Sequence, residues 1–277
     1  MKSFSVQDRL RRHYYRTTSD QAQWLTEEAL RQSAIVFAPH PDDETLGCGG
    51  TIIKKQQAGA KVSIVFMTDG RTSHGHLMDI AELTARRADE AIAAAQALGI
   101  ARDDVIFLNF VDGSLTMNQN VAAGRVAKIL EQRRPQQIFL PYYRDQLADH
   151  AAANRIVRAA LQIYSEPAML FEYPIWFWEH WPWVSLPRPL QRKTLAIMRN
   201  SLQAGLGLRL VQDFRYAVHI GDILNQKRNA LNQHRTQMFR LKPGLEWAIL
   251  SDVYNGQFLA CFFQEYEFFR GYQANIL

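Results

Sequence analysis

The sequence predicts an α/β protein with a mostly parallel sheet, arranged as a Rossmann-like three-layer sandwich. Four short apolar runs rich in Val, Ile and Phe have the near-continuous hydrophobicity of strands buried on both faces. These runs are 33–39, 61–70, 104–110 and 136–141. Segments with helical spacing separate them, and strand–helix–strand units of this length imply right-handed crossovers between parallel strands. The 277 residues suffice for one large domain.

Three segments repeat apolar residues at helical spacing. They are 82–98, 119–133 and 151–164. Gly99 follows the first as a stop signal, and Pro135 closes the region after the second. The order of runs and helices therefore alternates along the first 164 residues.

The rest of the chain departs from this alternation. Residues 1–32 are expected to form an N-terminal helical extension and 171–213 an aromatic- and Pro-rich insertion, both within a single domain of residues 1–277. The insertion is predicted to pack on the sheet or on a second subunit; alternatively, it is a lid that stacks on sugar rings or touches a lipid tail. A strand at 214–220 and a helix at 221–239 follow it, and C-terminal helical and strand elements complete the fold.

Composition and charge limit the class of partner. The net charge of +5 is spread along the chain and suits an acidic or phosphate-bearing ligand, and we expect no nucleic-acid binding. No apolar stretch reaches the roughly 18 residues of a membrane span. Contact with a membrane surface and formation of a homo-oligomer both stay open. The N-terminus lacks the apolar centre of a secretory signal, and Cys48 and Cys261 are expected as free thiols, so a cytoplasmic location is predicted.

The stretch "FAPHPDDETLGCGG" (37–50) directly follows the first apolar run and sets His40 beside three consecutive acids. Adjacent carboxylates repel one another, and burying them is costly unless a cation or hydrogen-bond donors compensate. His40 and Asp43 lie three apart on a turn that leaves a strand, so both can face one ion. Imidazole and carboxylate together suit zinc, although another divalent metal is compatible with them.

Polar loops also follow the next three apolar runs, at 68–76, 111–114 and 142–150. Ligands of parallel sheets bind beyond the carboxyl ends of the strands, so we expect these loops to converge on one site. His150 is the best candidate for a third metal ligand. Asp42 would take a proton from water, and Asp149 or Asp145 would orient a ring or hold a proton.

Three other interpretations of these residues were weighed. One of the three acids could simply cap the helix that follows, a role compatible with metal binding. The "GCGG" stretch lacks the G-x-G-x-x-G order and the Lys and Ser/Thr of a nucleotide loop, so a nicotinamide cofactor is not expected. His74 and His76 form an H-x-H that could bind metal on its own, but it ranks below the ligand set named above.

At the level of motifs, "PHPDDE" after an apolar strand resembles the signature of the LmbE-like, PIG-L-type zinc de-N-acetylases, which remove acetyl groups from N-acetylglucosamine conjugates. The resemblance continues in the same order through further segments and covers roughly residues 33 to 270. These segments are "TDG" at 68–70, "RADEAIAAAQALGI" at 87–100, "VDGSL" at 111–115, "DQLADH" at 145–150, "KRNALNQHRTQ" at 227–237 and "QEYEFF" at 264–269.

The resemblance implies a zinc-dependent deacetylase that acts on a small-molecule or glycoconjugate substrate. It implies His40, Asp43 and His150 as the zinc ligands and Asp42 as the general base. The candidate substrate contacts are Arg71, toward a hydroxyl, acetate or phosphate, and His234.

One departure from the family pattern concerns the proton donor. The family usually reads His-Pro-Asp-His before the fourth helix, whereas this chain reads "LADH", with Leu147 at the first histidine's place. Leucine performs no acid–base chemistry, and losing a general acid typically costs on the order of 10² to 10⁴ in rate. Either His74, His76 or His234 replaces it, or turnover is slow or lost. The alternatives are therefore an impaired member that binds a sugar or a protein, or an amidase acting on a non-sugar amide.

Overall fold

An eight-stranded sheet runs through the middle of the computed structural model, which describes residues 5–164, 166–186, 192–242 and 244–274. Its strand order is β1-β7-β8-β6-β5-β2-β3-β4. The strands are β1 Gln23–Trp24, β2 Ala34–Ala38, β3 Val62–Thr68, β4 Val105–Phe110, β5 Gln137–Pro141, β6 Met169–Tyr173, β7 Tyr216–His219 and β8 Tyr266–Gln273. Every neighbouring pair is parallel except those of β8, which runs antiparallel to β6 and β7. The predicted mostly parallel α/β fold is confirmed.

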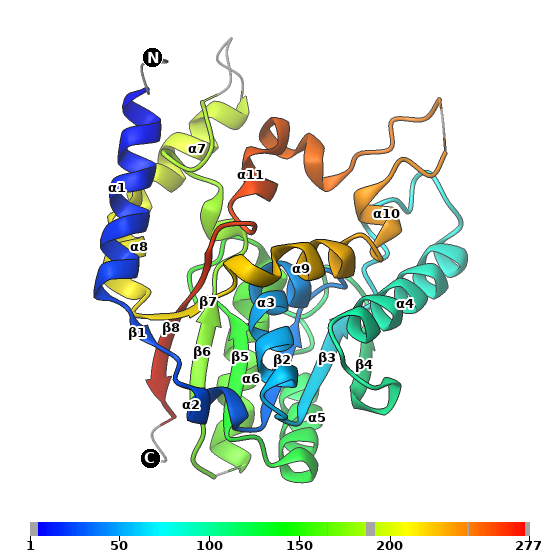
Figure 1. The fold of residues 1–277 in the computed structure, drawn as a ribbon. Helices are drawn as coiled ribbons and strands as arrows, with labels where there is room; N and C mark the ends of the chain where they lie inside the picture. The colour runs from blue at the N-terminus through cyan, green and yellow to red at the C-terminus, as the bar shows by residue number, and fades with distance from the viewer. Residues whose placement is uncertain (1–4, 165, 187–191, 243, 275–277) are drawn as a thin grey trace.

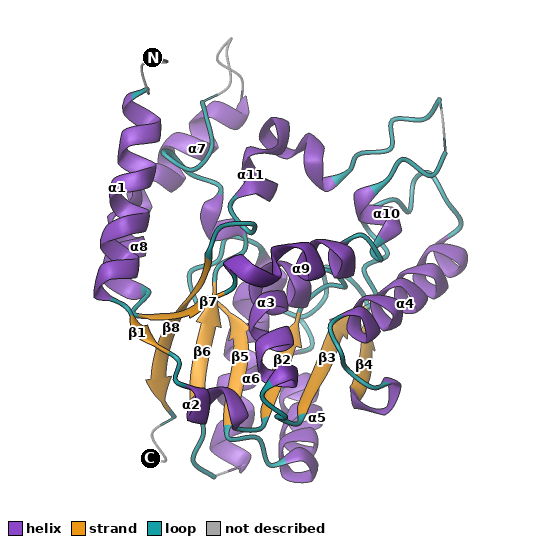
Figure 2. Ribbon diagram, in the orientation of Figure 1, coloured by secondary structure: helices purple, strands orange, loops and turns teal. Residues whose placement is uncertain are grey.

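Helices cover both faces of this sheet (Figures 1 and 2). α3 (Asp43–Gln57), α4 (Ile80–Ala97) and α9 (Leu224–Leu231) lie on one face, and α5 (Gln119–Arg133) and α6 (Ala148–Tyr164) on the other. Alternate residues of each central strand pack in the hydrophobic cores on opposite faces of the sheet. In β2, Val36 packs on the face covered by α3, α4 and α9, and Phe37 on the face covered by α5 and α6. This double burial explains the continuous apolar runs of the sequence.

The remaining helices lie toward the carboxyl edge of the sheet or beside its β1 end, except α2, which lies at the opposite edge near the start of β5 (Figure 1). They are α1 Val6–Gln21, α2 Glu27–Arg31, α7 Arg192–Gln203, α8 Leu208–Asp213, α10 Arg235–Met238 and α11 Gln257–Ala260. Parts of the expected extension and insertion, at 1–4 and 187–191, lie outside the described residues. Among those described, no helix combines the length and apolar character needed to cross a membrane.

One expected segment differs in detail from the prediction, and the aromatic segment packs on the sheet, which was one of its expected positions. The single helix expected at 221–239 is divided into α9 and α10, because the carboxylate of Glu90 accepts the Thr236 N–H (3.0 Å) and hydroxyl (2.7 Å) and so starts a new helix there. The aromatic segment after β6 packs inward: Trp178 and Trp183 are buried and join the core on the α3 side.

A buried ion pair fixes α3 against the sheet. Glu267 of β8 accepts the backbone N–H groups of Gly50 (2.8 Å) and Thr51 (2.7 Å) in the middle of α3. Lys227 of α9 donates to Glu267 (2.7 Å) and to the Leu46 carbonyl (2.9 Å). The approach is close: a Cβ at Gly50 would lie 2.5 Å from a methyl group of Ile220, so only glycine fits. The position of the α3 N-terminus therefore depends on this network.

We expect Lys227→Met to lower the free energy of unfolding by about 3–5 kcal/mol, because the variant leaves the Glu267 carboxylate buried without its cation. Urea denaturation measures the loss. Lys54→Met is the matched control, since it breaks the pair of Lys54 with the half-exposed Asp222 (2.7 Å) and should cost less than about 1 kcal/mol. Equal losses in both variants would contradict a special role for the buried pair.

Candidate metal centre and its cavity

The polar loops that follow β2, β3, β4 and β5 meet at the carboxyl edge of the sheet and line a cavity of about 410 Å³. Its wall includes His40, Asp42 and Asp43 from the β2–α3 turn, Asp112 from the loop after β4, and Asp149 at the start of α6. The expected convergence of these loops is thus present in the structure.

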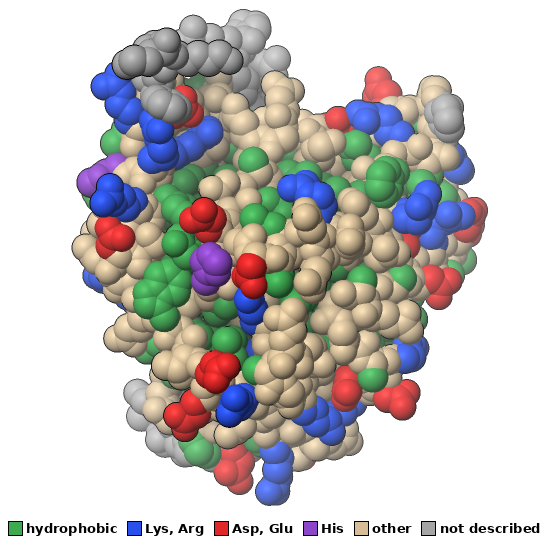
Figure 3. Space-filling view, viewed as in Figure 1, with side chains coloured by type: hydrophobic (Ala, Val, Ile, Leu, Met, Phe, Trp, Pro, Cys, Tyr) green, Lys and Arg blue, Asp and Glu red, His purple; other side chains and the backbone are tan. Residues whose placement is uncertain are grey.

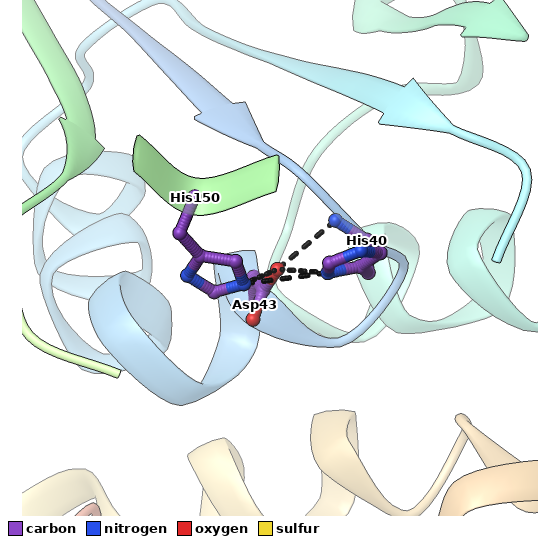
Figure 4. Close-up of side chains that lie close together, drawn as sticks. All are labelled: His40, Asp43 and His150. Carbon is purple, nitrogen blue, oxygen red and sulfur yellow. Dashed lines mark hydrogen bonds and ion pairs between the residues drawn. The ribbon is translucent and has the colours of Figure 1, made fainter. Parts of the chain in front are cut away.

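Three donor atoms from two segments come together at the base of this cavity (Figure 4). His40 Nδ1 lies 3.2 Å from Asp43 Oδ2, His150 Nε2 lies 3.2 Å from the same oxygen, and the two ring nitrogens are 3.3 Å apart. Bonds of about 2.0–2.2 Å to a tetrahedral metal separate neighbouring donors by about 3.3 Å. These three residues therefore fit one face of a four-coordinate divalent ion, with a position left open.

Carboxylates orient the two rings from behind. Asp145 Oδ2 lies 3.2 Å from His150 Nδ1 and also accepts the backbone N–H groups of Ile175 and Trp176, each at 3.1 Å. Such a carboxylate fixes the ring orientation and tautomer of a metal-binding histidine. The residue that faces His150 is thus Asp145, one of the two acids that the sequence offered for this task.

Asp149, the other acid, lies against His40. Its Oδ2 is 3.6 Å from His40 Nε2, and Asp112 Oδ1 is 3.1 Å from the same nitrogen. Backbone N–H groups of Gly113 (2.7 Å) and Leu115 (3.2 Å) hold the Asp149 carboxylate. His40 therefore has one nitrogen toward the metal position and one toward two carboxylates.

The protonation of this cluster reflects a concentration of negative charge. Burial alone would lower the pKa of both rings, yet Asp112, Asp149 and Asp43 raise the pKa of His40 well above its usual value. Asp43 and Asp145 likewise raise the pKa of His150 to about 9. Burial opposes ionisation of Asp43, but the two rings hold its pKa below the usual range. Metal binding requires deprotonated ligands, so a divalent cation would replace these protons and meet the same negative potential.

Asp42 has a strained backbone and a perturbed carboxyl group. Its φ is 127°, a value that residues other than glycine rarely adopt. Glu44 Oε2 accepts the Asp42 N–H (3.0 Å), and Arg87 lies 3.6 Å from its carboxylate and donates to the Pro41 carbonyl. Burial raises the pKa of Asp42 to about 7; Arg87 opposes this shift and Asp43 adds to it. Asp42 is thus a buried acid held at the cavity wall.

His234 lies behind this wall. Its side chain is 1% exposed, and its Nε2 donates to Glu44 Oε1 over 2.8 Å. The Glu44 carboxylate raises the pKa of His234 despite burial. His234 does not line the cavity, and Glu44, which it contacts, also accepts the Asp42 N–H.

The other histidines and Arg71 are placed away from the metal position. The Arg71 guanidinium binds Asp69, at 2.5 and 2.7 Å, and does not line the cavity. His74 does line it, but its Nε2 donates to the Ala248 carbonyl (2.8 Å) and its ring stacks on Trp247. Burial lowers the pKa of His74, and His76 is exposed outside the cavity.

Sequence reasoning missed Asp112 and Arg87, and it named His234 only as a substrate contact or proton donor without its pairing with Glu44. Asp112 belongs to a loop that the sequence marked as polar, so its position after a strand was a usable signal. Arg87 lies on the buried face of α4 beside Leu83, and a charge among apolar helical positions is another such signal. The Glu44–His234 pair joins residues 190 positions apart, and no local pattern marks it.

Comparisons with known proteins agree with this geometry. The model of the PIG-L family, described as GlcNAc-PI de-N-acetylase, matches residues 35–161. A 1D-myo-inositol 2-acetamido-2-deoxy-alpha-D-glucopyranoside deacetylase of Rhodococcus opacus is 26% identical, over 80% of this chain and 87% of its own. A diacetylchitobiose deacetylase of Thermococcus kodakarensis is 30% identical over 40% of each chain.

A solved structure extends the likeness to nearly the whole fold. The N,N'-diacetylchitobiose deacetylase from Pyrococcus horikoshii matches with a TM-score of 0.63 and 20% identity, covering 98% of this chain and 95% of its own. This match shows the fold, and the family match includes both the β2–α3 turn and the start of α6. Residues 35–161 thus match the PIG-L (LmbE-like) family model, and the relatives named above are deacetylases.

Proposed function

We propose that this protein is a metal-dependent amide hydrolase that removes the acetyl group from an N-acetylated amino sugar within a glycoconjugate. The observation that carries the proposal is the triangle of His40, Asp43 and His150 donor atoms. Two of these residues, His40 and Asp43, line the cavity together with the buried acid Asp42. Relatives named as deacetylases of acetylated glucosamine compounds support the choice of substrate class.

His40, Asp43 and His150 would hold the metal, and zinc is the ion we propose, because two imidazoles and a carboxylate with an open position are typical of catalytic zinc. The bound ion would act as a Lewis acid toward the acetyl carbonyl. Asp145 would keep the ring of His150 in place, and we assign the same task at His40 to Asp149, with Asp112 beside it.

Asp42 would accept a proton from the attacking water. A pKa of about 7 lets the carboxyl group take up and release a proton near neutral pH. The contacts of Asp42 with Glu44 and Arg87 hold it in a conformation that its backbone would not otherwise prefer. We therefore propose Glu44, His234 and Arg87 as positioning residues for this base.

The leaving amine needs a proton, and Leu147 cannot supply it. Leu147 lines the cavity and is 38% exposed, while the only other histidine besides His40 in the described wall, His74, is engaged with Ala248. Asp42 would therefore pass the proton it took from water to the amine nitrogen as the C–N bond breaks. The products are acetate and the free amino sugar. Arg71, next to the wall residue Thr72, would contact the part of the conjugate outside the cavity.

Leu147 also favours a second candidate function. A chain without a dedicated proton donor could bind an N-acetylated sugar without appreciable turnover, or could hydrolyse a more reactive non-sugar amide. The assay is acetate release from a panel of N-acetylglucosamine conjugates, compared with release from simple N-acetyl amides. It distinguishes the sugar deacetylase, the sugar-binding protein and the amidase from one another.

For Asp42→Asn, we expect acetate release from the best conjugate to fall by on the order of 10² to 10⁴, because the amide accepts no proton from water. Metal content should stay at the wild-type level, since Asp42 is not one of the three ligands. Chelation of the wild type should abolish the same activity. Undiminished turnover in the variant or after chelation would refute the mechanism.

For Asp145→Asn, we expect the affinity for Zn²⁺ to weaken on the order of 10- to 100-fold, because His150 loses the carboxylate that orients its ring. Competition with a chromogenic chelator measures the change. Asp222→Asn, at an exposed acid paired with Lys54, is the matched control and should bind Zn²⁺ as the wild type does. Unchanged affinity in Asp145→Asn would count against the ligand assignment.

Leu147→His is expected to raise the rate of deacetylation by about tenfold or more, because an imidazole at the cavity wall can protonate the leaving amine. Leu147→Gln, polar but unable to transfer a proton at neutral pH, is its control and should give no increase. An active wild type that gains nothing from the histidine would show that Asp42 already suffices. Activity that appears only in Leu147→His would instead identify the natural chain as a binder.

A further inference from the structure

Helix α7 buries several polar side chains beside Ile197 and exposes several large apolar ones. Thr194, Asn200 and Ser201 are buried, with exposed fractions of 0, 2 and 4%, whereas Leu195 and Leu202 are 71 and 73% exposed. A surface helix normally shows the opposite arrangement. Met198, 46% exposed, lies between the two leucines at helical spacing, so the three form one apolar stripe.

Hydrogen bonds hold Ser201 and the Asn200 NH₂ group of α7, while Asn200 Oδ1 has no partner in the described part of the chain. Ser201 Oγ accepts the Trp181 N–H (2.9 Å) and donates to the Ile197 carbonyl (2.6 Å). The Asn200 amide donates to the Glu179 carbonyl (3.4 Å). These bonds hold α7 against the buried aromatic segment in an orientation that leaves Leu195 and Leu202 exposed.

Neighbouring helices also expose apolar residues. Leu206 and Leu208, 45 and 48% exposed, follow α7 at the start of α8, and Val6 of α1 is 66% exposed. α1 packs along α8, and a Cβ at Gly207 would lie 2.8 Å from the ring of Tyr14. Figure 1 shows α1, α7 and α8 gathered at one corner of the molecule. We call this corner the α1–α7–α8 face.

The three helices that make up this face also hold, by sequence, the excess of basic residues of the chain. By sequence, α1, α7 and α8 contain eight Arg and Lys against three Asp, a net charge of +5, which equals that of the whole protein. The rest of the chain has 24 basic and 24 acidic residues and therefore no net charge. Lys and Arg side chains gather visibly over α1 at this corner (Figure 3).

We propose that the α1–α7–α8 face docks on a membrane surface that contains anionic lipids. Exposed leucines on a helix flanked by basic residues enter the interface between headgroups and acyl chains, and the positive charge is attracted to anionic headgroups. A second copy of this chain is a poorer partner, because the two positive faces would repel each other when brought together. This proposal does not depend on the reaction proposed above.

The experiment is co-sedimentation of the full chain with vesicles of phosphatidylcholine alone or of an equimolar mixture with phosphatidylglycerol. We expect binding to the anionic vesicles at least about tenfold tighter than to the neutral ones, weakening as salt rises. The double variant Leu195→Gln/Leu202→Gln should lose about tenfold or more of this affinity.

Met117→Gln/Ile163→Gln is the matched control, since both side chains are exposed (82 and 56%) but lie away from this face. It should bind vesicles as the wild type does. Unfolding transitions of both double variants establish that they fold. Equal binding to neutral and anionic vesicles, or equal loss in the control, would overturn the proposal. So would a dimer, seen by sedimentation, that only Leu195→Gln/Leu202→Gln dissociates, because the face would then be a self-interface.

Discussion

The site depends above all on the neutralisation of three consecutive buried carboxylates at the start of α3. Asp42, Asp43 and Glu44 are 7, 2 and 0% exposed, a burial that repulsion and desolvation would forbid without compensation. Each carboxylate has a different compensating partner: Arg87 for the first, two imidazoles for the second and His234 for the third. Because the partners differ, neighbouring carboxyl groups differ in pKa: that of Asp42 is raised, whereas that of Asp43 is lowered.

Much of this arrangement follows from periodicity and position in the chain. Apolar runs indicated β2, β3, β4 and β5, and polar residues after them indicated the edge at which a site would form. That reasoning placed His40, Asp43 and His150 near one another, because parallel strands end at a common edge.

The partners that decide each side chain's chemistry could not be predicted in the same way. His234 reaches Glu44 across the fold, and Lys227 and Glu267 meet against α3 from two distant elements. The sequence pattern also predicted a single helix at 221–239, whereas the Glu90 carboxylate divides this region into α9 and α10. The inverted burial of α7 depends on hydrogen bonds to Trp181 and Glu179, which periodicity does not register.

Asp145 contacts the cavity wall as well as the ring of His150. One of its oxygens serves both the His150 ring and the backbone of Ile175 and Trp176, and these last two residues belong to the cavity wall. A ligand that displaces this wall must also disturb the carboxylate behind the metal ligand. Occupancy of the cavity and of the proposed metal position would then be thermodynamically linked, and the linkage would be reciprocal: whatever factor the ion contributed to ligand affinity, the ligand would return to the ion.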